Sequence, residues 1–457
     1  MAVQAAGRDA GRLNGGRRML RGCAASCSTC CWRQARRSRS RPSSSAPARR
    51  NGCSSGCGTL PGSTSCSCSR SARTGFGSSG SEDMARVLVA PQEFKGSATA
   101  GEAAEAIAAG IRRSLPSAEI DCCPLSDGGP GFLAVLQAAR GGRPVPATVH
   151  DPLGRQREAS FLMLEDGTAV IEAAQANGLA LVRPEERDPL RADTAGVGEL
   201  IARALEERPR RIFIGVGGSA TNDGGAGMAR ALGARLWDGA GRPLGPGAAP
   251  LAAVARIDWE PPAALAGVDV VVAADVRNPL LGPDGATAVY APQKGAGPAE
   301  LDVLEAALTR WAAAVRRSLG FDMAAVPGGG AAGGLAAGLA AFLGARIVSG
   351  FELVAETVGL AARMAASDAV ATGEGRFDRQ SLQGKVTGEV IRRAQQLGKP
   401  TVLFAGSVEG DARAATAAEL VDLSLVEPDV QQRMARVREL LEEAAARWAA
   451  RALAGTS

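Results

Sequence analysis

Lysine is scarce in this 457-residue chain, so the places where it occurs are informative. Arginine supplies 48 of the 52 basic side chains, and the four lysines are Lys95, Lys294, Lys385 and Lys399. The first three each stand next to a glycine in a polar turn. A compact ammonium group beside exposed backbone amides is a usual environment for phosphate. We therefore expect the first three turns to bind phosphate, with an exposed turn lysine as the alternative, and we expect Lys399 to be an ordinary turn residue.

A glycine-rich segment follows the apolar stretch 211–216. Its candidate binding residues are Gly217, Gly218, Ser219, Thr221, Asn222 and Asp223. Glycines let a backbone approach a ligand closely, and the start of a helix presents free N–H groups to an anion. The side chains add hydroxyl, amide and carboxylate groups at the same strand end. We expect this loop to bind an anionic ligand, and the alternative is a tight turn capped by Asn and Asp.

Acidic and amide residues follow several other predicted strands. These residues are Asp127, Asp275, Asn278, Glu374 and Asp378. The carboxyl ends of the strands are where open α/β sheets bind ligands. Asp275 could hold Mg²⁺ or accept a hydroxyl proton, with Asn278 as an orienting group. Each residue alone fits an ordinary turn, but together they predict one convergent site.

The composition excludes several kinds of chemistry. His150 and Tyr290 are the only histidine and tyrosine, which argues against a Ser-His-Asp triad and a multi-histidine metal site. No segment matches the Walker pattern Gly-x₄-Gly-Lys-Ser/Thr. The spacing Gly215-x-Gly217-x-x-Ala220, with Asp238 further on, loosely fits a dinucleotide fingerprint, so an NAD(P)-dependent oxidoreductase is an alternative. No uninterrupted apolar run is long enough to span a membrane.

From Met84 onward, strand-like and helix-like segments alternate. Apolar runs predict strands, and the sequence from Thr99 to Glu102 is a capping box that opens a helix ending near Ser114. Such alternation predicts an α/β fold with parallel sheets covered by helices. We expect a Rossmann-like doubly wound domain built from both chain ends, residues 84–145 and 348–457. A second α/β domain, residues 146–347, is expected to be inserted between them.

The first 83 residues differ sharply from the rest. They hold 14 Arg, no Lys and three acids, for a formal charge of +11, together with 17 Ser and eight of the ten Cys. Apolar periodicity is absent, so the segment is predicted to be disordered. We favour the interpretation that translation begins at Met84. Cys122 and Cys123, the only later cysteines, predict a reducing, cytoplasmic compartment.

Three other interpretations of residues 1–83 remain. The pairs Cys27/Cys30 and Cys53/Cys57 have zinc-ligand spacing, but the remaining cysteines there follow no repeat. The arginine clusters would suit a nucleic-acid-binding or scaffold protein, although no aromatic platform accompanies them. An Arg- and Ser-rich, acid-poor start also fits an organelle transit peptide.

Taken together and in order, the motifs resemble the bacterial glycerate kinase family that makes 2-phosphoglycerate. They are the segments 90–97, 126–131, 217–225, 275–280, 291–295 and 372–380 with Gly384-Lys385, across roughly residues 84–427. Ser219-Ala-Thr-Asn-Asp223 and Thr372-Gly-Glu-Gly-Arg376 are the specific ones. The resemblance implies two α/β domains, one of them Rossmann-like, with an active site in the cleft between them.

The chain departs from the family pattern at four positions. The family usually has Asp where Gln92 stands, Ser where Glu93 stands, Glu where Pro130 stands and Thr where Phe132 stands. If the family aspartate is catalytic, Gln92 cannot be a base. Glu93 is one substitute for it. The departures affect the expected substrate more than the expected reaction type.

The resemblance implies phosphoryl transfer from ATP, with Mg²⁺, to a hydroxyl group of D-glycerate. Lys95 and Lys294 would neutralise phosphate or the glycerate carboxylate, and Gly217, Gly218 and Ser219 would donate backbone hydrogen bonds. Either Asp223 or Asp275 would hold Mg²⁺ while the other acts as base. Asp378 and Lys385 are further candidates for the site. We expect small-molecule partners, glycerate and ATP, and neither nucleic acid nor a membrane.

Overall fold

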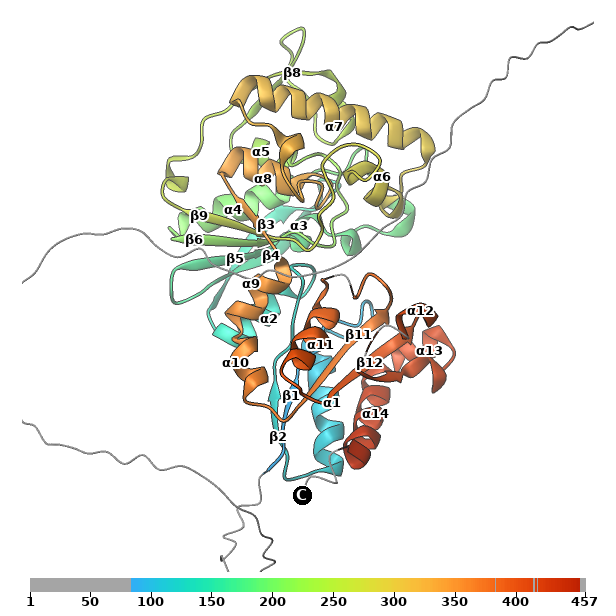
Figure 1. The fold of residues 1–457 in the computed structure, drawn as a ribbon. Coiled ribbons are helices and arrows are strands. Elements are labelled where there is room, and N and C mark those ends of the chain that lie inside the picture. The colour runs from blue at the N-terminus through green and yellow to red at the C-terminus, as the bar shows by residue number, and fades with distance from the viewer. Residues whose placement is uncertain (1–83, 383, 414–415, 417, 453–457) are drawn as a thin grey trace, which may run out of the picture. The chain divides into compact units, whose positions relative to one another are not determined.

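Two main β-sheets organise the part of the chain that the structure, a computed structural model, describes (Figure 1). That part comprises residues 84–382, 384–413, 416 and 418–452. The predictions of disorder, zinc, nucleic-acid binding and targeting for residues 1–83 therefore lie outside the described residues.

The first sheet combines both ends of the described chain. Its strands lie in the order β13 (Glu419–Asp422), β12 (Thr401–Val408), β11 (Ala369–Phe377), β1 (Arg86–Val89) and β2 (Glu119–Cys122). Every neighbouring pair is parallel. The strand order reverses between β1 and β11, which makes this a doubly wound sheet with a switch point at that place. The predicted fold class is confirmed.

Helices cover both faces of this sheet, as a doubly wound sheet requires. On one face, α1 (Ala100–Ser114) and α14 (Val437–Ala452) pack their apolar residues against β1, β11 and β12. On the other face, the apolar residues of α11 (Val386–Gln396) pack near β1 and β11. The predicted capping box opens α1, because the Thr99 hydroxyl oxygen accepts from Glu102 N at 3.2 Å and Thr99 N donates to the Glu102 carboxylate at 2.9 Å.

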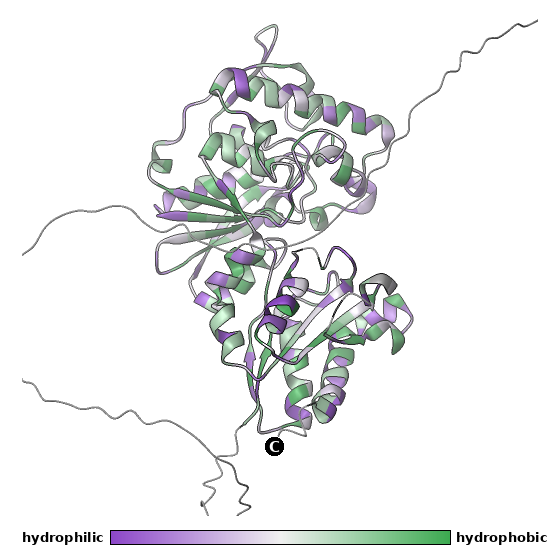
Figure 2. Cartoon of the chain, viewed as in Figure 1, coloured by the Kyte–Doolittle hydropathy of each residue, from purple (hydrophilic) through white to green (hydrophobic). Residues whose placement is uncertain are grey.

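The second sheet comes from the middle of the chain. Its order is β10 (Arg346–Val348), β9 (Asp269–Ala273), β6 (Arg211–Gly215), β5 (Thr168–Glu172), β4 (Gln156–Met163) and β3 (Arg143–His150). The pairs from β10 to β5 are parallel, while β5/β4 and β4/β3 are antiparallel. Its strands are largely apolar (Figure 2), and β5 is buried throughout.

The largest apolar core lies around this second sheet. Residues from α4 (Ala195–Glu206), α7 (Pro298–Leu319) and α8 (Leu335–Leu343) contribute to it. A different core contains apolar residues of both sheets together with those of three helices, which are α2 (Phe132–Arg140), α9 (Gly350–Thr357) and α10 (Leu360–Ala365). The predicted boundaries at 145/146 and 347/348 stay a prediction, since β3 begins at Arg143 and β10 ends at Val348.

Some elements differ from the predicted pattern. The sequence pattern predicts one helix over residues 351–364. The structure has two there, α9 and α10, because Gly359 between them has a φ of 71°, which a helix cannot contain. The pattern also predicts one helix over residues 428–452, and the structure divides it into α13 (Val430–Ala435) and α14. Elements that the sequence did not predict are β7 (Arg235–Asp238), β8 (Val254–Asp258), β10, α3 (Ala174–Asn177), α5 (Ala226–Ala231), α6 (Ala286–Tyr290) and α12 (Gly410–Arg413).

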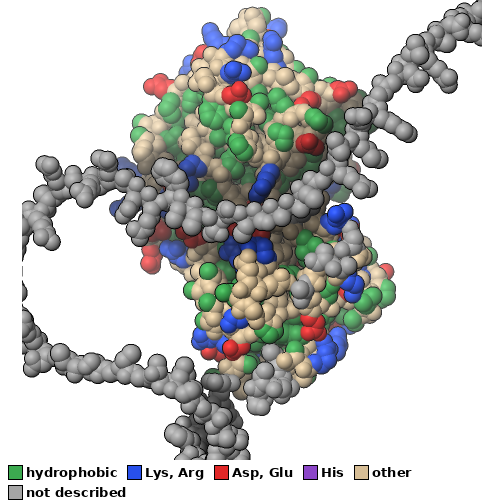
Figure 3. Space-filling model, in the orientation of Figure 1, with side chains coloured by type: hydrophobic (Ala, Val, Ile, Leu, Met, Phe, Trp, Pro, Cys, Tyr) green, Lys and Arg blue, Asp and Glu red, His purple; other side chains and the backbone are tan. Residues whose placement is uncertain are grey.

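The described surface carries both signs of charge. On the face drawn in Figure 3, basic and acidic side chains are interspersed over the surface that the grey segments leave visible. Among the described residues, the structure contains no helix that combines the length and the apolar character needed to span a membrane.

Contact between α1 and α14 predicts the effect of a small substitution. A Cβ atom at Gly110 would stand 2.1 Å from the Glu442 carbonyl oxygen, whereas one at Gly101, in the same helix, would meet only the Thr99 hydroxyl at 4.0 Å. Gly110→Ala should lower the free energy of unfolding by about 1–3 kcal/mol, because the helices must separate. Gly101→Ala should leave it unchanged or raise it by up to about 1 kcal/mol. Urea denaturation of both variants measures this, and equal stabilities would contradict the close packing.

Candidate functional site

A glycine turn after β2 rests directly on the carboxyl ends of β6 and β9. Gly217 N donates to the Gly128 carbonyl oxygen at 3.0 Å. A Cβ atom at Gly128 would stand 2.6 Å from the Ala273 carbonyl oxygen, and one at Gly217 would stand 2.5 Å from Gly129 Cα. Only glycines permit this approach, which places Asp127, the residue before the turn, beside the ends of strands from the other sheet.

Asp275, just beyond β9, is held at the start of α9. Its carboxylate accepts from the Ser349 hydroxyl at 2.7 Å and from Phe351 N at 2.9 Å. Burial raises the pKa of Asp275 to about 6, and the nearby charge of Asp127 raises this pKa further against the hydrogen bonds that lower it. The structure therefore brings Asp127 and Asp275 together, as the sequence predicted.

Glu93 and Lys95, which follow β1, belong to the same group. Burial raises the pKa of Glu93 to about 7, with Lys95 acting to lower this pKa and Asp127 and Glu172 acting to raise it. Lys95 is exposed. We call Glu93, Lys95, Asp127 and Asp275 the strand-end cluster. It combines three carboxyl groups with one accessible ammonium group.

The segment of the strand-end cluster that carries Glu93 and Lys95 lies at the switch point of the first sheet. Gln92 N donates to the Gly373 carbonyl oxygen at 2.8 Å, so the segment after β1 continues alongside β11. A Cβ atom at Gly375 would be 3.3 Å from Lys95 N. Ligands of doubly wound sheets bind where the strand order reverses. This placement favours ligand binding over a surface turn for Lys95.

Sequence reasoning missed Glu172, the last residue of β5. Its carboxylate is buried and accepts from Leu133 N at 3.1 Å, in the first turn of α2. Burial raises the pKa of Glu172, and the hydrogen bonds from the α2 start lower it. A charged residue that ends a fully buried strand was the signal that could have identified it.

Lys294 is buried and its ammonium group binds protein acceptors. Its Nζ donates to the Ser219 hydroxyl at 3.2 Å and to the Thr221 carbonyl oxygen at 2.6 Å. Burial lowers the pKa of Lys294 to about 7, against the opposing charge of Asp223. In this arrangement the ammonium group holds the 217–225 loop in place, which differs from the predicted direct contact with phosphate.

Asp223 is fully buried and its carboxylate is occupied by protein donors. Thr194 N at 3.0 Å, the Thr194 hydroxyl at 2.7 Å and Gly227 N at 2.9 Å donate to one oxygen, and Gly225 N at 3.2 Å donates to the other. Burial and the charge of Asp193 raise the pKa of Asp223. These contacts favour a structural role for Asp223 over the predicted metal-binding or base role.

The other polar residues of the loop are also used internally. Asn222 Nδ2 donates to the Thr287 hydroxyl at 3.2 Å, and Asn177 Nδ2 donates to the Thr221 hydroxyl at 3.3 Å. Within the described residues, the buried Oδ1 atoms of both asparagines have no hydrogen-bond partner.

The two glycines at the start of the loop also face protein atoms. The Gly217 amide is committed to Gly128, and a Cβ atom at Gly218, whose φ is 75°, would stand 3.0 Å from the Pro130 ring. The predicted phosphate cradle is therefore partly filled by the protein itself.

A separate group surrounds the connection between β11 and α11. The Glu374 carboxylate accepts from the Thr387 hydroxyl, and burial raises the pKa of Glu374 to about 7, with Lys385 lowering it and Asp378 raising it. Asp378 Oδ1 accepts from Gln380 N at 2.8 Å, and Lys385 Nζ donates to Gln380 Oε1 at 3.2 Å. These three predicted residues form one local network.

Asn278 lies in a loop contact of its own. Its Oδ1 accepts from the Tyr290 hydroxyl at 2.6 Å, and its Nδ2 donates to the Asp284 carbonyl oxygen at 2.8 Å. Both contacts are to protein atoms, so in this arrangement Asn278 orients a loop next to Asp275.

Comparison with known proteins decides the family. The sequence profile of the glycerate kinase family matches residues 87–453. The chain belongs to the glycerate kinase family. A glycerate kinase from Bacillus subtilis (strain 168) is 44% identical over 331 residues, which cover 72% of this chain and 87% of the relative. A glycerate 2-kinase from Escherichia coli (strain K12) is 43% identical over 334 residues, covering 71% and 86%.

A solved structure has the same fold. A crystal structure from Salmonella typhimurium LT2, assigned as glycerate kinase 2, matches with a TM-score of 0.69 and 39% identity. The match covers 82% of this chain and 99% of that one. Membership of this family makes the chain an ATP-dependent kinase. Asp238, which the dinucleotide pattern required, instead binds Arg242 Nε at 2.8 Å in the turn after β7.

The raised pKa of Glu93 predicts a pH-dependent stability. The folded protein holds the Glu93 proton more tightly than the unfolded chain, so ionised Glu93 destabilises the fold as pH rises from about 4.5 to about 7. Glu93→Gln should therefore match wild type near pH 4.5 and be about 1–2 kcal/mol more stable at pH 8, after allowance for partial exposure. Urea denaturation at both pH values tests this, with exposed Glu105→Gln as the control. A stability difference that does not change with pH would contradict the placement of Glu93.

Proposed function

We propose that this chain transfers the γ-phosphoryl group of ATP to D-glycerate, giving 2-phosphoglycerate and ADP, with Mg²⁺. The observation that supports the proposal is the strand-end cluster, where Lys95 and Glu93, at the switch point of the first sheet, lie near the carboxyl groups of Asp127 and Asp275. Family membership supports the substrate class, and the relative from Escherichia coli named as a glycerate 2-kinase supports the 2-position.

The charged residues of the cluster have different proposed roles, which are anion binding for Lys95 and proton transfer for Glu93. Lys95 is exposed and would bind the glycerate carboxylate or the transferred phosphoryl group as a point charge. Glu93, with a pKa of about 7, would accept the proton of the attacking hydroxyl group, because a base works best when its pKa is near the working pH. Gln92, where the family usually has Asp, has a buried Oε1 without a partner in the described part of the chain and cannot take up a proton at neutral pH.

The donor set near the cluster fits Mg²⁺ when phosphate oxygens complete the coordination. Within the described ranges, no group of three or more His, Cys, Asp or Glu residues could hold a metal by itself. Mg²⁺ usually needs only one or two protein carboxylates beside substrate phosphates. Asp127 and Asp275 are the pair that would hold it, and the bound ion would neutralise charge on the phosphate oxygens. Asp223 is not proposed for this role, because its carboxylate is fully buried and accepts four protein hydrogen bonds, whereas Asp275 is only partly buried.

The cytoplasmic location stays a proposal of the same kind. Cys122 and Cys123 are both free thiols in the structure, as expected in a reducing compartment.

Substitutions in the strand-end cluster test the assigned roles. Lys95→Met should lower kcat/KM by about 100-fold or more, because a charge-assisted contact of about 3 kcal/mol is lost in the transition state. Asp275→Asn should lower kcat by a similar factor and raise the Mg²⁺ concentration needed for half-maximal rate. Lys399→Met is the matched control, since the Lys399 ammonium binds the Ala365 and Ser367 carbonyl oxygens instead. Wild-type turnover in the Lys95 and Asp275 variants would contradict the roles of Lys95 in anion binding and of Asp275 in Mg²⁺ binding.

The product identifies the reaction. The full chain with MgATP should release ADP with D-glycerate and much more slowly with other small hydroxy acids. Coupling through enolase should give phosphoenolpyruvate at once if the product is 2-phosphoglycerate. A signal that requires added phosphoglycerate mutase would show that the 3-hydroxyl is phosphorylated. No ADP release with any hydroxy acid would contradict the proposed function.

A further inference from the structure

Glu172 is a buried carboxylate to which the proposed reaction has so far given no role. It is the last residue of β5, a strand that is buried along its whole length, and it pairs in register with Gly215 at the end of β6. Glutamate is rarely buried unless a partner compensates its charge. The groups that surround the Glu172 carboxylate therefore indicate what it does.

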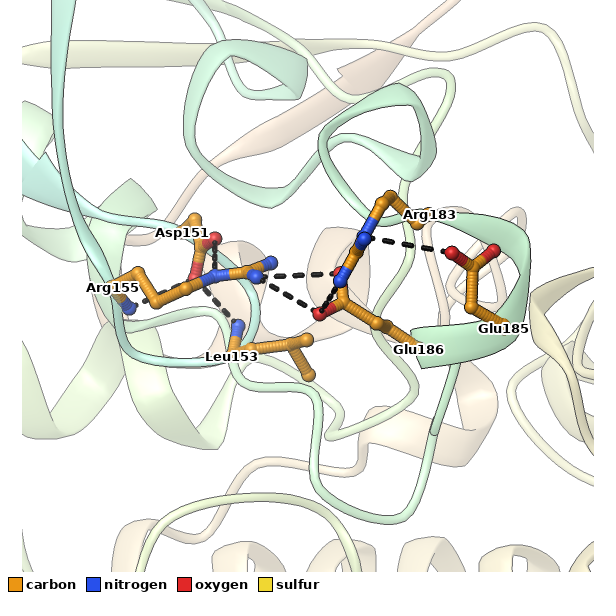
Figure 4. A network of polar contacts seen from close by, with 6 residues as sticks. All are labelled: Asp151, Leu153, Arg155, Arg183, Glu185 and Glu186. Carbon is orange, nitrogen blue, oxygen red and sulfur yellow. Dashed lines mark hydrogen bonds and ion pairs between the residues drawn. The ribbon is translucent and has the colours of Figure 1, made fainter.

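Other glutamates of the chain are compensated by arginine, as in the network of Figure 4. There, Arg183 binds the Glu186 carboxylate at 2.9 Å and Arg155 binds it at 3.3 Å, and together they lower the pKa of Glu186 to about 2. Glu172 has no such partner among the described lysines and arginines. Burial raises its pKa, and only hydrogen bonds from backbone N–H groups act in the opposite direction.

Those N–H groups belong to the start of α2, which has no cap of its own. Gly131, the residue before the helix, has a φ of 84° and no side chain that could accept a hydrogen bond. The first N–H groups of a helix have no partner within the helix. The Glu172 carboxylate accepts from Leu133 N at 3.1 Å and also from Gly131 N. A residue of the second sheet thus caps α2, with the charge that a helix start favours.

The start of α2 is continuous with the turn that carries Asp127. Phe132 N, in the first residue of α2, donates to the Gly129 carbonyl oxygen of this turn at 3.1 Å. A Cβ atom at Gly215 would stand 2.6 Å from the Gly128 carbonyl oxygen and 2.7 Å from the Phe132 ring. The turn and the helix start therefore pack as one unit on the end of β6, next to Glu172 at the end of β5.

We propose that Glu172 is a positioning residue for Mg²⁺ at the strand-end cluster, because its carboxylate anchors the start of α2 and thereby the turn that carries Asp127. This inference rests on the proposed function, in which Asp127 and Asp275 hold the ion. Groups that hold a metal-binding residue in place commonly change the affinity for the metal when they are removed. The charge of Glu172 also acts to raise the pKa of Glu93, so its influence reaches a second member of the cluster.

Three substitutions of Glu172 separate its hydrogen bond from its charge. Glu172→Gln keeps an acceptor oxygen at the same reach and removes the charge. Glu172→Asp keeps the charge on a side chain that is one methylene shorter, and Glu172→Ala removes both. Glu185→Gln is the control, because it removes an exposed carboxylate that lies 3.6 Å from Arg183 in the network of Figure 4. A thermal melt verifies that each variant is folded.

Amide hydrogen exchange at the start of α2 measures the anchor without any ligand. Exchange in a peptide that covers Leu133 should be about tenfold faster in Glu172→Ala and Glu172→Asp, because the acceptor of its N–H group is lost. It should stay within about threefold of wild type in Glu172→Gln and in the control.

Magnesium binding measures the consequence for the site. Calorimetry of the full chain with Mg²⁺ and a non-hydrolysable ATP analogue should show about tenfold weaker Mg²⁺ binding in Glu172→Ala and Glu172→Asp. Glu172→Gln should restore most of the affinity. The Mg²⁺ concentration for half-maximal rate should follow the same order. If Glu172→Ala does not fold, Glu172→Asp gives the same test.

The other outcomes overturn the inference or separate it from the proposed function. Wild-type exchange in Glu172→Ala and Glu172→Asp would contradict the anchor. Faster exchange with unchanged Mg²⁺ binding would leave Glu172 a purely structural residue and overturn its positioning role. Weak Mg²⁺ binding in Glu172→Gln but not in Glu172→Asp would assign the effect to charge and also overturn it. If Mg²⁺ binding depends on Glu172 as expected but wild type phosphorylates no glycerate, the proposed function fails and this inference stands.

Discussion

The candidate site depends on one backbone contact. The Gly128-Gly129 turn packs directly against Gly217, after β6, and against Ala273, at the end of β9. Side chains there would keep the segments apart, since Cβ atoms would come within 2.5–2.6 Å of backbone atoms. Without this approach, Asp127 would not be near Asp275, and the carboxylates of the two sheets would not share one electrostatic environment. The glycine richness of these motifs is thus explained by packing between strand ends as well as by any ligand.

Burial then separates the charged groups into two kinds. Asp223 and Lys294 are buried and surrounded by protein partners, so they stabilise the shape of the loop. Glu93 and Asp275 are only partly buried, and their pKa values are raised to about 7 and about 6. A carboxyl group whose pKa is near neutrality can exchange a proton at physiological pH, which is what phosphoryl transfer to a hydroxyl group requires. The sequence alone assigned Asp223, Asp275 and Lys294 to the site and considered Glu93 only as a substitute for the family aspartate.

Local rules predicted the elements well and the contacts less well. The Thr99 capping box, the strand before Gly217 and the doubly wound sheet all follow from periodicity and turn residues, and the structure contains them. The direction of a side chain at a strand end is decided by packing between distant segments, which one sequence does not show. Glu172, at the end of β5, was missed for this reason, and Lys294, in a short helical turn after α6, is buried against Ser219 and Thr221. Asp275 and Asp127 follow strands of different sheets, and the close approach of the Gly128 turn to Ala273 brings them together.

The most direct measurement is a crystal structure of the full chain with D-glycerate, Mg²⁺ and a non-hydrolysable ATP analogue. Our account predicts a glycerate hydroxyl group at hydrogen-bonding distance from a carboxylate of the strand-end cluster, with Lys95 contacting the glycerate carboxylate or the terminal phosphate. Glycerate bound away from Glu93, Lys95, Asp127 and Asp275, for example against the Glu374–Lys385 network, would contradict it.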